Sequence, residues 1–293
     1  MSDADLEERK SRAAAWFRQL RDAIADGFNT IEREAGALYA DREPGVVEIT
    51  PWSRGEDGED AGGGEMGVLK GRVFEKAAVH ISTVYGEFSP EFAKQIPGAD
   101  QDPRFWAAGI SLIAHPRNPH TPSAHMNTRM IATTKTWFGG GGDLNPMMDR
   151  YRTDGHEDTL AFHAPYKAAC DTADPAFYPK FKAWADEYFY NHHRGEARGV
   201  GGIFYDRHST GDWEADFAFT QNVGRAFWKA YEPVVRRRME TPWTDADREE
   251  QLIRRGRYAE YNLLYDRGTQ FGLKTGGNVE AILSSLPPEA KWP

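Results

Sequence analysis

The stretch AGISLIAHPRNPHTPSAHMNTRMIATTKTWFGGGGDL, residues 108–144, decides the fold class. Its first part alternates like an extended strand, with Ser111, Ile113 and His115 on one face. Residues 125–131 alternate in the same way. The three prolines of residues 116–122 suit an ordered turn between neighbouring strands. The stretch therefore predicts an antiparallel hairpin followed by a third strand that ends in glycine.

Polar side chains fall on one face of this hairpin. If the two strands pair, His115, His125, Asn127 and Arg129 converge on a single side. A half-buried face of an antiparallel sheet should be either apolar or fully wet. A polar face beside a proline-fixed loop indicates a functional site.

The glycine run at 139–142 has two interpretations. Glycine lets the backbone approach a large flat ligand closely or turn sharply. The run lacks the GxxxxGK[ST] pattern, so a phosphate-binding loop is unsupported. On its own, the run does not distinguish a ligand contact from a flexible turn.

Composition restricts the classes of protein. The chain has 293 residues with 40% hydrophobic side chains, which suits one large globular domain spanning residues 1–293. Cys170 is the single cysteine, which excludes a disulfide framework and a cysteine-held iron–sulfur cluster. We expect it to be a buried thiol. No signal peptide or membrane span is evident, so a cytoplasmic location is expected.

The formal net charge is −9, which opposes binding to nucleic acid and to anionic membranes. Arginine nevertheless clusters locally, at 193–198, 234–240 and 254–258. Such clusters are typical of salt-bridged helix faces, and that interpretation suits 234–240 best. They are also what an acidic protein needs if its substrate carries carboxylates.

Apolar periodicity predicts the other elements. Helices are expected at 4–37, 176–191 and 212–240, with Pro233 kinking the last one. Strands are expected at 45–50, 72–88, 200–206 and 258–266. The polar, glycine-rich residues 53–67 are expected to form a mobile loop.

The histidines leave two chemistries open. His115 and His125 could bind a divalent transition metal across the hairpin, with His163 and His193 supplied by distant segments. No HExxH pattern supports such a site. His125 beside Arg129 could instead act as a proton donor without any metal.

Five phrases, read together, resemble the oxygen-dependent coproporphyrinogen III oxidases. They are GISLIAHPRNPHTPSAHMNTR, WFGGGGDLNP, YPKFKAWADEYFYNHHRGEARGVGGIFYD, RRGRYAEYNLLYDRGTQFGLKTGG and SSLPP, in unbroken order over residues 67–292. The resemblance implies oxidative decarboxylation of two propionates of coproporphyrinogen III to vinyl groups. The products are protoporphyrinogen IX, carbon dioxide and hydrogen peroxide. Oxygen is the co-substrate, and no flavin, haem or iron–sulfur cluster is implied.

The resemblance also assigns residues. It implies His125 as proton donor and a divalent metal held by His115, His125, His163 and His193. It implies substrate contacts from a set that spans both ends of the matched region: Ser111, Asn127, Thr128, Arg129, Gly276, Gly277 and Asn278. Asp206 could hydrogen-bond pyrrole N–H groups, although a strand-end cap explains it equally well.

Two positions depart from the family pattern. Asn278 stands where the enteric-type pattern TGGR has arginine. Arg207 stands where the common FFDD pattern has its second acid. These departures keep two alternatives open, a metal-dependent oxygenase acting on another substrate and a tetrapyrrole-binding protein without catalysis.

The implied fold is α+β, with a large antiparallel sheet flanked by helices on both sides. The resemblance also implies a homodimer, paired through segment 258–292. The aromatic and large apolar residues of that segment suit either an interface or an internal strand.

Overall fold

The computed structural model describes residues 2–55, 60–274 and 276–293. Its centre is a seven-stranded sheet in the order β1-β2-β3-β4-β5-β6-β9, and every neighbouring pair is antiparallel. The predicted hairpin is confirmed. The strands are β1 (Glu48–Ser53), β2 (Gly62–Leu69), β3 (Phe74–Glu87), β4 (Arg104–Pro116), β5 (Ser123–Ala132), β6 (Thr136–Asn145) and β9 (Gly202–His208), and β7 (Tyr190–Asn191) pairs with β8 (Glu196–Ala197) in a separate ribbon.

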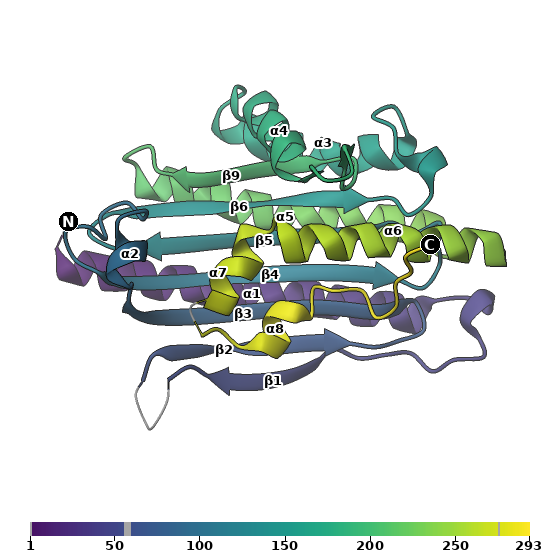
Figure 1. The fold of residues 1–293 in the computed structure, drawn as a ribbon, viewed down its shortest axis with the longest axis horizontal. Coiled ribbons are helices and arrows are strands. Elements are labelled where there is room, and N and C mark those ends of the chain that lie inside the picture. Colours follow the sequence, from purple (N-terminus) through teal and green to yellow (C-terminus); the bar gives the residue numbers. More distant parts are fainter. Residues whose placement is uncertain (1, 56–59, 275) are drawn as a thin grey trace.

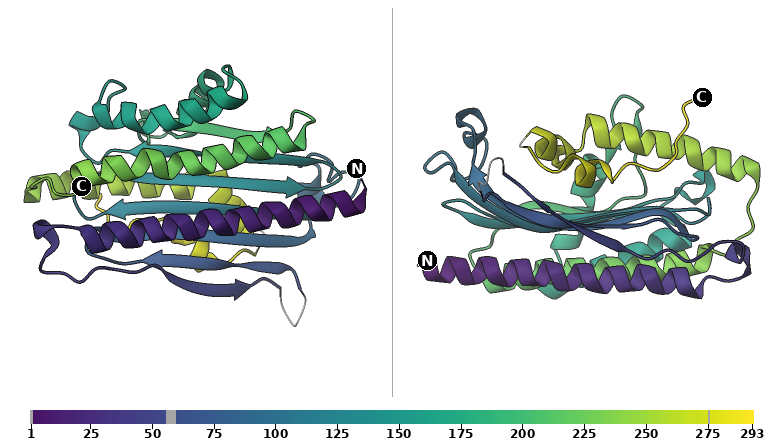
Figure 2. Two further views of the ribbon diagram at one scale, coloured as in Figure 1. Left: turned by 180° about the vertical axis from the view of Figure 1, so that it is seen from behind. Right: turned by 90° about the horizontal axis from the view of Figure 1, so that it is seen from below.

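Long helices cover one face of the sheet (Figure 2). They are α1 (Asp3–Glu34), α3 (Glu157–Ala173) and α5 (Trp213–Arg238), and α4 (Phe177–Tyr188) packs against β9. The predicted apolar stripe of α1 is buried, with Phe17, Ile24 and Phe28 at most 1% exposed. These side chains meet the even-numbered residues of β4 and β5, such as Leu112 and Met126, in the main core.

The C-terminal part of the chain covers the opposite face (Figure 1). It comprises α6 (Asp245–Leu264), α7 (Arg267–Lys274), α8 (Val279–Leu283) and the extended end of the chain. The short α2 (Pro90–Ala93) and two 3₁₀ turns, Ala37–Tyr39 and Asp149–Tyr151, complete the elements. The predicted α+β class with helices on both faces of the sheet is confirmed.

The prediction of a strand at 258–266 is wrong, because these residues form the last turns of helix α6 and the turn that follows it. Thr244 caps that helix with a reciprocal hydrogen-bond box to Asp247. Tyr258, Tyr261 and Asn262 are buried at helical spacing, three and four residues apart. The aromatic, strand-favouring side chains of Tyr258 and Tyr261 therefore reflect packing against the sheet and not strand pairing.

The predicted loop at 53–67 is wrong for residues 62–67, which belong to β2; residues 56–59 lie outside the described residues. β2 pairs with β1 on one side and with β3 on the other. A Cβ at Gly63 or Gly64 would lie 2.3 Å from a carbonyl oxygen of a neighbouring strand. These glycines therefore allow close strand packing, which is a different use from chain flexibility.

Smaller differences concern element ends. β1 begins at Glu48, three residues later than expected, and the glycine run lies inside β6 and does not end it. Among the described residues, no helix is long and apolar enough to cross a membrane.

Candidate functional site

The sheet register brings the predicted polar residues together on the face covered by α6, α7 and α8. Ser111 pairs with Asn127, Ile113 with His125, and Gly109 with Arg129. Ser111 is exposed, while His125, Asn127 and Arg129 are half-buried. The alternation of residues in β5 thus produces a row of polar side chains on a sheet face that is only partly covered.

A continuous hydrogen-bond chain runs along this row. Arg129 Nη2 donates to Asp206 Oδ1 at 2.7 Å, and Arg129 Nη1 donates to Asn127 Oδ1 at 3.1 Å. Asn127 Nδ2 lies 3.3 Å from His125 Nε2. His125 Nδ1 lies 3.2 Å from Asp143 Oδ1. Side chains of β5, β6 and β9 therefore form one connected network.

The direction of each bond in this network is fixed by its ends. Arginine can only donate, and an ionised carboxylate can only accept. Asn127 consequently accepts from Arg129 with its oxygen and donates to His125 with its nitrogen. His125 then carries its proton on Nδ1, facing Asp143, and its Nε2 lone pair faces the polar row.

Asp143 is held as a carboxylate by Arg198. Burial alone would raise the pKa of Asp143, but the charge of Arg198 and the hydrogen bonds from His125 and Arg198 hold the pKa below its ordinary value. Arg198 donates to both carboxylate oxygens, at 2.7 and 3.0 Å. The pKa of Arg198 is raised because the Asp143 charge outweighs the burial of the guanidinium. The pair is therefore ionised although it is fully buried.

Arg198 is itself fixed by α6 and by aromatic rings. Its Nη1 donates to Asn262 Oδ1 at 2.8 Å, and its guanidinium carbon lies 4.4 Å from the ring centres of Phe189 and Tyr261. Asn262 belongs to helix α6, whose end was predicted as a strand. This helix therefore holds Arg198, which in turn binds Asp143 beside His125. Sequence reasoning missed Asp143 and Asn262, and it noted Arg198 only as part of the arginine cluster at 193–198. The position of Asp143 directly after the glycine run was the other local signal.

Gly139 makes room for the Arg129–Asp206 pair. A Cβ at this position would lie 2.9 Å from the guanidinium carbon of Arg129 and 2.9 Å from Asp206 Oδ1. The β6–β9 register shifts here, so that Asp206 and Arg207 together lie opposite Gly139. This β-bulge brings Asp206 over the glycine, and the predicted close approach at the glycine run serves an ion pair of the protein itself.

Thr128 lies on the other face of the sheet, so its side chain does not join the polar row. It is fully buried, with its methyl group directed toward Gly140. Successive side chains of a strand point to opposite faces, so the side chain of Thr128 lies away from His125, Asn127 and Arg129. The substrate contact that the resemblance implies for Thr128 stays a prediction.

The four histidines of the expected metal site do not meet within the chain. His115 is fully buried between Ser123 Oγ and the carbonyl of Ser285. His163 lies on α3 between the Tyr178 hydroxyl and the Val200 carbonyl. His193 contacts Tyr265 and Glu260. Among the described residues no group of three or more histidine, cysteine, aspartate or glutamate side chains could hold a metal ion, so these residues do not fit a four-histidine site in one chain.

Gly276, Gly277 and Asn278 join α7 to α8, on the same side of the sheet as the polar row (Figure 1). Gly276 has a φ of 71°, a left-handed conformation that favours glycine. Asn278 caps α8, where its side-chain oxygen accepts from the backbone N–H of Ala281 at 2.9 Å. The oxygen of Asn278 is therefore engaged within the chain.

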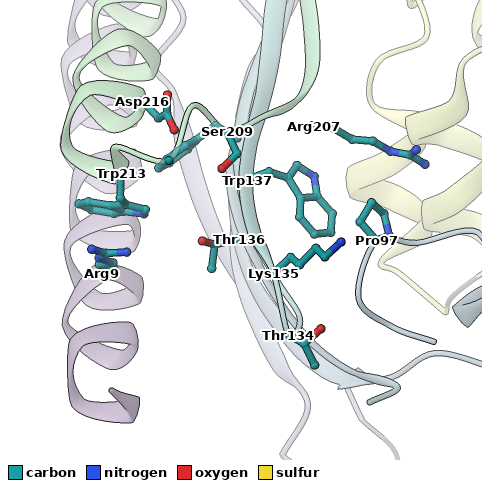
Figure 3. A pocket seen from close by; sticks show the side chains of 12 residues that line it. Arg9, Pro97, Thr134, Lys135, Thr136, Trp137, Arg207, Ser209, Trp213 and Asp216 are labelled. Carbon is teal, nitrogen blue, oxygen red and sulfur yellow. The ribbon is translucent and has the colours of Figure 1, made fainter. Parts of the chain in front are cut away.

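A cavity of about 480 Å³ lies at the end of the sheet where the β5–β6 turn meets the bulge (Figure 3). Trp137, Lys135, Arg207 and Pro97 line it on the side of the C-terminal helices, and Arg9, Trp213 and Asp216 on the side of α1 and α5. A smaller cavity of about 210 Å³ lies beside Phe189 and Val200. Cys170 is fully buried, as expected, and burial raises its pKa to about 12.

Comparison with known proteins gives one consistent result. The sequence model of the family described as coproporphyrinogen III oxidase matches residues 12–293. The oxygen-dependent coproporphyrinogen-III oxidase of Rickettsia bellii (strain RML369-C) is 54% identical over 279 residues, covering 95% of this chain and 96% of the relative. The protein of the same name from Rickettsia conorii (strain ATCC VR-613 / Malish 7) is 52% identical over 285 residues, covering 97% of this chain and 99% of the relative.

Proposed function

The chain belongs to the coproporphyrinogen III oxidase family, and from this premise we propose that it converts coproporphyrinogen III to protoporphyrinogen IX with oxygen. In each of two turnovers a propionate loses its carboxylate as carbon dioxide and becomes a vinyl group. The β-hydrogen and two electrons pass to O₂, which takes up one proton to give hydrogen peroxide. The observation that carries the proposal is the connected row from Asp206 to Asp143 on a partly open sheet face.

Arg129 is the residue that we assign to a substrate carboxylate. Its guanidinium is half-buried and hydrogen-bonded to Asp206 and Asn127, so it is oriented before any ligand arrives. Planar guanidinium groups match carboxylates in a two-point geometry. Ser111, exposed on the neighbouring strand, supplies a hydroxyl on the same face.

His125 is the residue that we assign to proton transfer. With Nδ1 tied to Asp143, its Nε2 is the nitrogen that exchanges protons with the polar row. A carboxylate that binds Arg129 competes with Asn127 for the guanidinium and thereby frees the Asn127 amide to turn. The amide oxygen can then accept from a protonated Nε2. Asp143 would stabilise the imidazolium that forms, as a buried carboxylate does in other proton-transfer sites.

Oxygen chemistry without a resident cofactor is the version of the mechanism that we propose. The electron-rich pyrrole reacts with oxygen, and the protein contributes orientation, exclusion of water and proton management. No step is assigned to a metal, because the four histidines have separate partners within the chain. Asp206 either contacts pyrrole N–H groups or holds Arg129 in place, and its 2.7 Å bond to Arg129 favours the second role.

The deciding experiment is aerobic turnover of coproporphyrinogen III by chelator-treated protein, followed as protoporphyrin fluorescence after oxidation. We expect turnover without added metal and a large loss in His125→Ala. If activity returned only with one added metal, the metal-free version would be wrong and a metal-dependent oxygenase would replace it. If coproporphyrin bound without any turnover, a tetrapyrrole carrier would be the better description.

A homodimer in a reducing, cytoplasmic compartment completes the proposal. The C-terminal segment supports the dimer, since five of its large apolar side chains are at least 42% exposed: Leu263, Leu264, Leu273, Val279 and Trp292. Exposed apolar side chains that gather into one patch mark interaction surfaces. The single buried cysteine suits a reducing compartment. Gel filtration that gives a single 33.0 kDa particle would contradict the dimer.

A further inference from the structure

Arg207 has a backbone conformation that arginine rarely adopts. Its φ of 51° makes it the one non-glycine residue with positive φ among the residues that the structure describes. Such a conformation costs free energy and persists where the surroundings enforce it, often at functional sites. The strain arises in the β-bulge, where Asp206 and Arg207 both lie opposite Gly139. Bulges beside active sites redirect side chains.

The redirected side chain reaches the end of the polar row. Asp206 pairs with Arg129, and Arg207 extends toward Pro97, where its Nη2 donates to the Gln95 carbonyl at 3.0 Å. Figure 3 shows Arg207 and Lys135 on either side of Trp137, on the side of the C-terminal helices. Trp137 and Gly139 are two residues apart in β6, a step of about 7 Å along a strand. The cavity therefore adjoins the Arg129–Asp206 pair.

Both cations lack a carboxylate partner within the described ranges. No aspartate or glutamate oxygen among those residues lies within 4.0 Å of the charged nitrogens of Arg207 or Lys135. The only acid lining the cavity is Asp216, on the opposite side of the sheet in Figure 3. Its carboxylate is already engaged with Thr210 and His208. Both side chains are exposed, and two cations without a carboxylate partner beside one cavity suit an anionic ligand.

We propose that Arg207 and Lys135 form a second carboxylate subsite, which binds one peripheral propionate of the tetrapyrrole while Arg129 binds another. Trp137 provides an apolar wall beside the two cations. This inference rests on the proposed function, because it takes the tetracarboxylate substrate from there. The subsite favours substrates that carry a second carboxylate in addition to the propionate bound by Arg129.

The test measures binding of coproporphyrin III, the stable oxidised porphyrin with the same four propionates, by fluorescence titration. We expect Arg207→Gly and Lys135→Ala each to raise the Kd about tenfold, as for the loss of one charged contact. Arg207→Lys should restore most of the affinity. Lys229→Ala, which removes an exposed lysine from α5, is the matched control and should bind like the wild type.

Arg207→Gly also separates a binding role from a structural role. Glycine adopts positive φ without strain, so the melting temperature should stay the same or rise while affinity falls. The affinity difference between variant and wild type should shrink at high salt, because the Debye length falls from about 30 Å at 0.01 M to about 8 Å at 0.15 M.

Wild-type affinity in Arg207→Gly and Lys135→Ala would overturn the subsite. A loss of affinity that does not respond to salt would also overturn it. Failure of the proposed function is a separate result, because it appears as a wild-type protein that binds coproporphyrin III but never turns over coproporphyrinogen III.

Discussion

His125 has a hydrogen-bond partner at each ring nitrogen. One partner is half-buried and the other is fully buried. Asn127, its Nε2 partner, lies two residues along the same strand, so alternation in the sequence was enough to predict that the two side chains share one face of the sheet. Asp143 on β6 and Arg198 before β9 arrive through strand pairing and through α6. No local pattern encodes those distances, which is why sequence reasoning found the exposed half of the site and missed the buried half.

Asp143→Asn tests the buried half. The substitution removes the charge that orients His125 and leaves Arg198 buried and unpaired, so we expect a loss of about 3–5 kcal/mol of stability. We also expect kcat to fall at least about 100-fold, the usual scale for lost acid–base assistance. Asp158→Asn is the matched control, since Asp158 is equally buried and paired with Arg237 and Arg238. It should lose stability and keep kcat; an equal fall in kcat in both variants would refute the role.

Gly139→Ala tests the seat of the Arg129–Asp206 pair. The added methyl group would lie 2.9 Å from both partners, so the ion pair must separate or the strand must shift. Because Arg129 is then misdirected, we expect KM to rise about tenfold with a smaller change in kcat. Gly155→Ala adds a methyl group where no atom lies within 4 Å and should change neither constant. Steady-state kinetics of the two variants decide the matter.

At the scale of elements, the C-terminal end of α1 is tied to the sheet by one carboxylate. Glu32 is fully buried and accepts four backbone N–H bonds at 2.8–3.0 Å, from Gly45, Arg72, Val73 and Phe74. Apolar periodicity predicted α1 correctly, but a glutamate in the helix gave no sign of this function. Gly45, Arg72 and Val73 lie outside the strands and Phe74 begins β3, so their positions depend on the finished sheet.

Glu32→Gln should therefore destabilise the protein. The amide NH₂ group would face backbone donors that it cannot accept from, and a buried donor without a partner costs about 1–3 kcal/mol. Thermal or urea unfolding measures the loss. Glu34→Gln, two residues further along on the exposed side of the helix, should change the free energy of unfolding by less than about 0.5 kcal/mol. Equal stability of the two variants would argue against the role of Glu32.

Helix α6 explains the largest error of sequence reasoning at this scale. Residues 258–266 are rich in aromatic side chains and therefore look like a strand. The longer segment from Thr244 carries the helical signals, namely a capping box and burial three and four residues apart. Within the nine residues 258–266 the strand propensity of the aromatic side chains outweighs the helical periodicity, which is visible only over the whole of α6.

At the scale of the whole molecule, stability should depend on pH through buried histidines. Burial lowers the pKa of His80 to about 4 from an ordinary 6.5, and it lowers the pKa of His115 well below that value. Between pH 6.5 and 4 the unfolded chain binds protons that the folded chain does not. The contribution of these histidines to the free energy of unfolding is therefore fully present above pH 6.5. It falls as the pH drops, by about 1.4 kcal/mol per pH unit for each such histidine.

His80→Gln should flatten this dependence. Unfolding free energies measured from pH 8 to pH 4 would show a smaller slope in the variant, by about one proton. The carboxylates with lowered pKa values, among them Asp102 and Asp247 near 2, are the same in variant and wild type, so their effect cancels in the comparison. An identical slope in variant and wild type would contradict the assignment to His80.

Assembly is the property of the whole molecule that the single chain encodes least directly, and the exposed leucines of α6 provide its test. Leu263 and Leu264 are each 52% exposed at the end of the helix that also holds Asn262 against Arg198. If this end packs against a second copy, replacing both leucines by glutamate should convert a dimer into a 33.0 kDa particle in scattering or gel filtration. Leu160→Glu, at a site 59% exposed on α3, should leave the dimer intact.

Because α6 positions Arg198 and α7 and α8 cover the polar row, the monomer should also lose kcat/KM. A monomeric variant with full activity would separate assembly from catalysis.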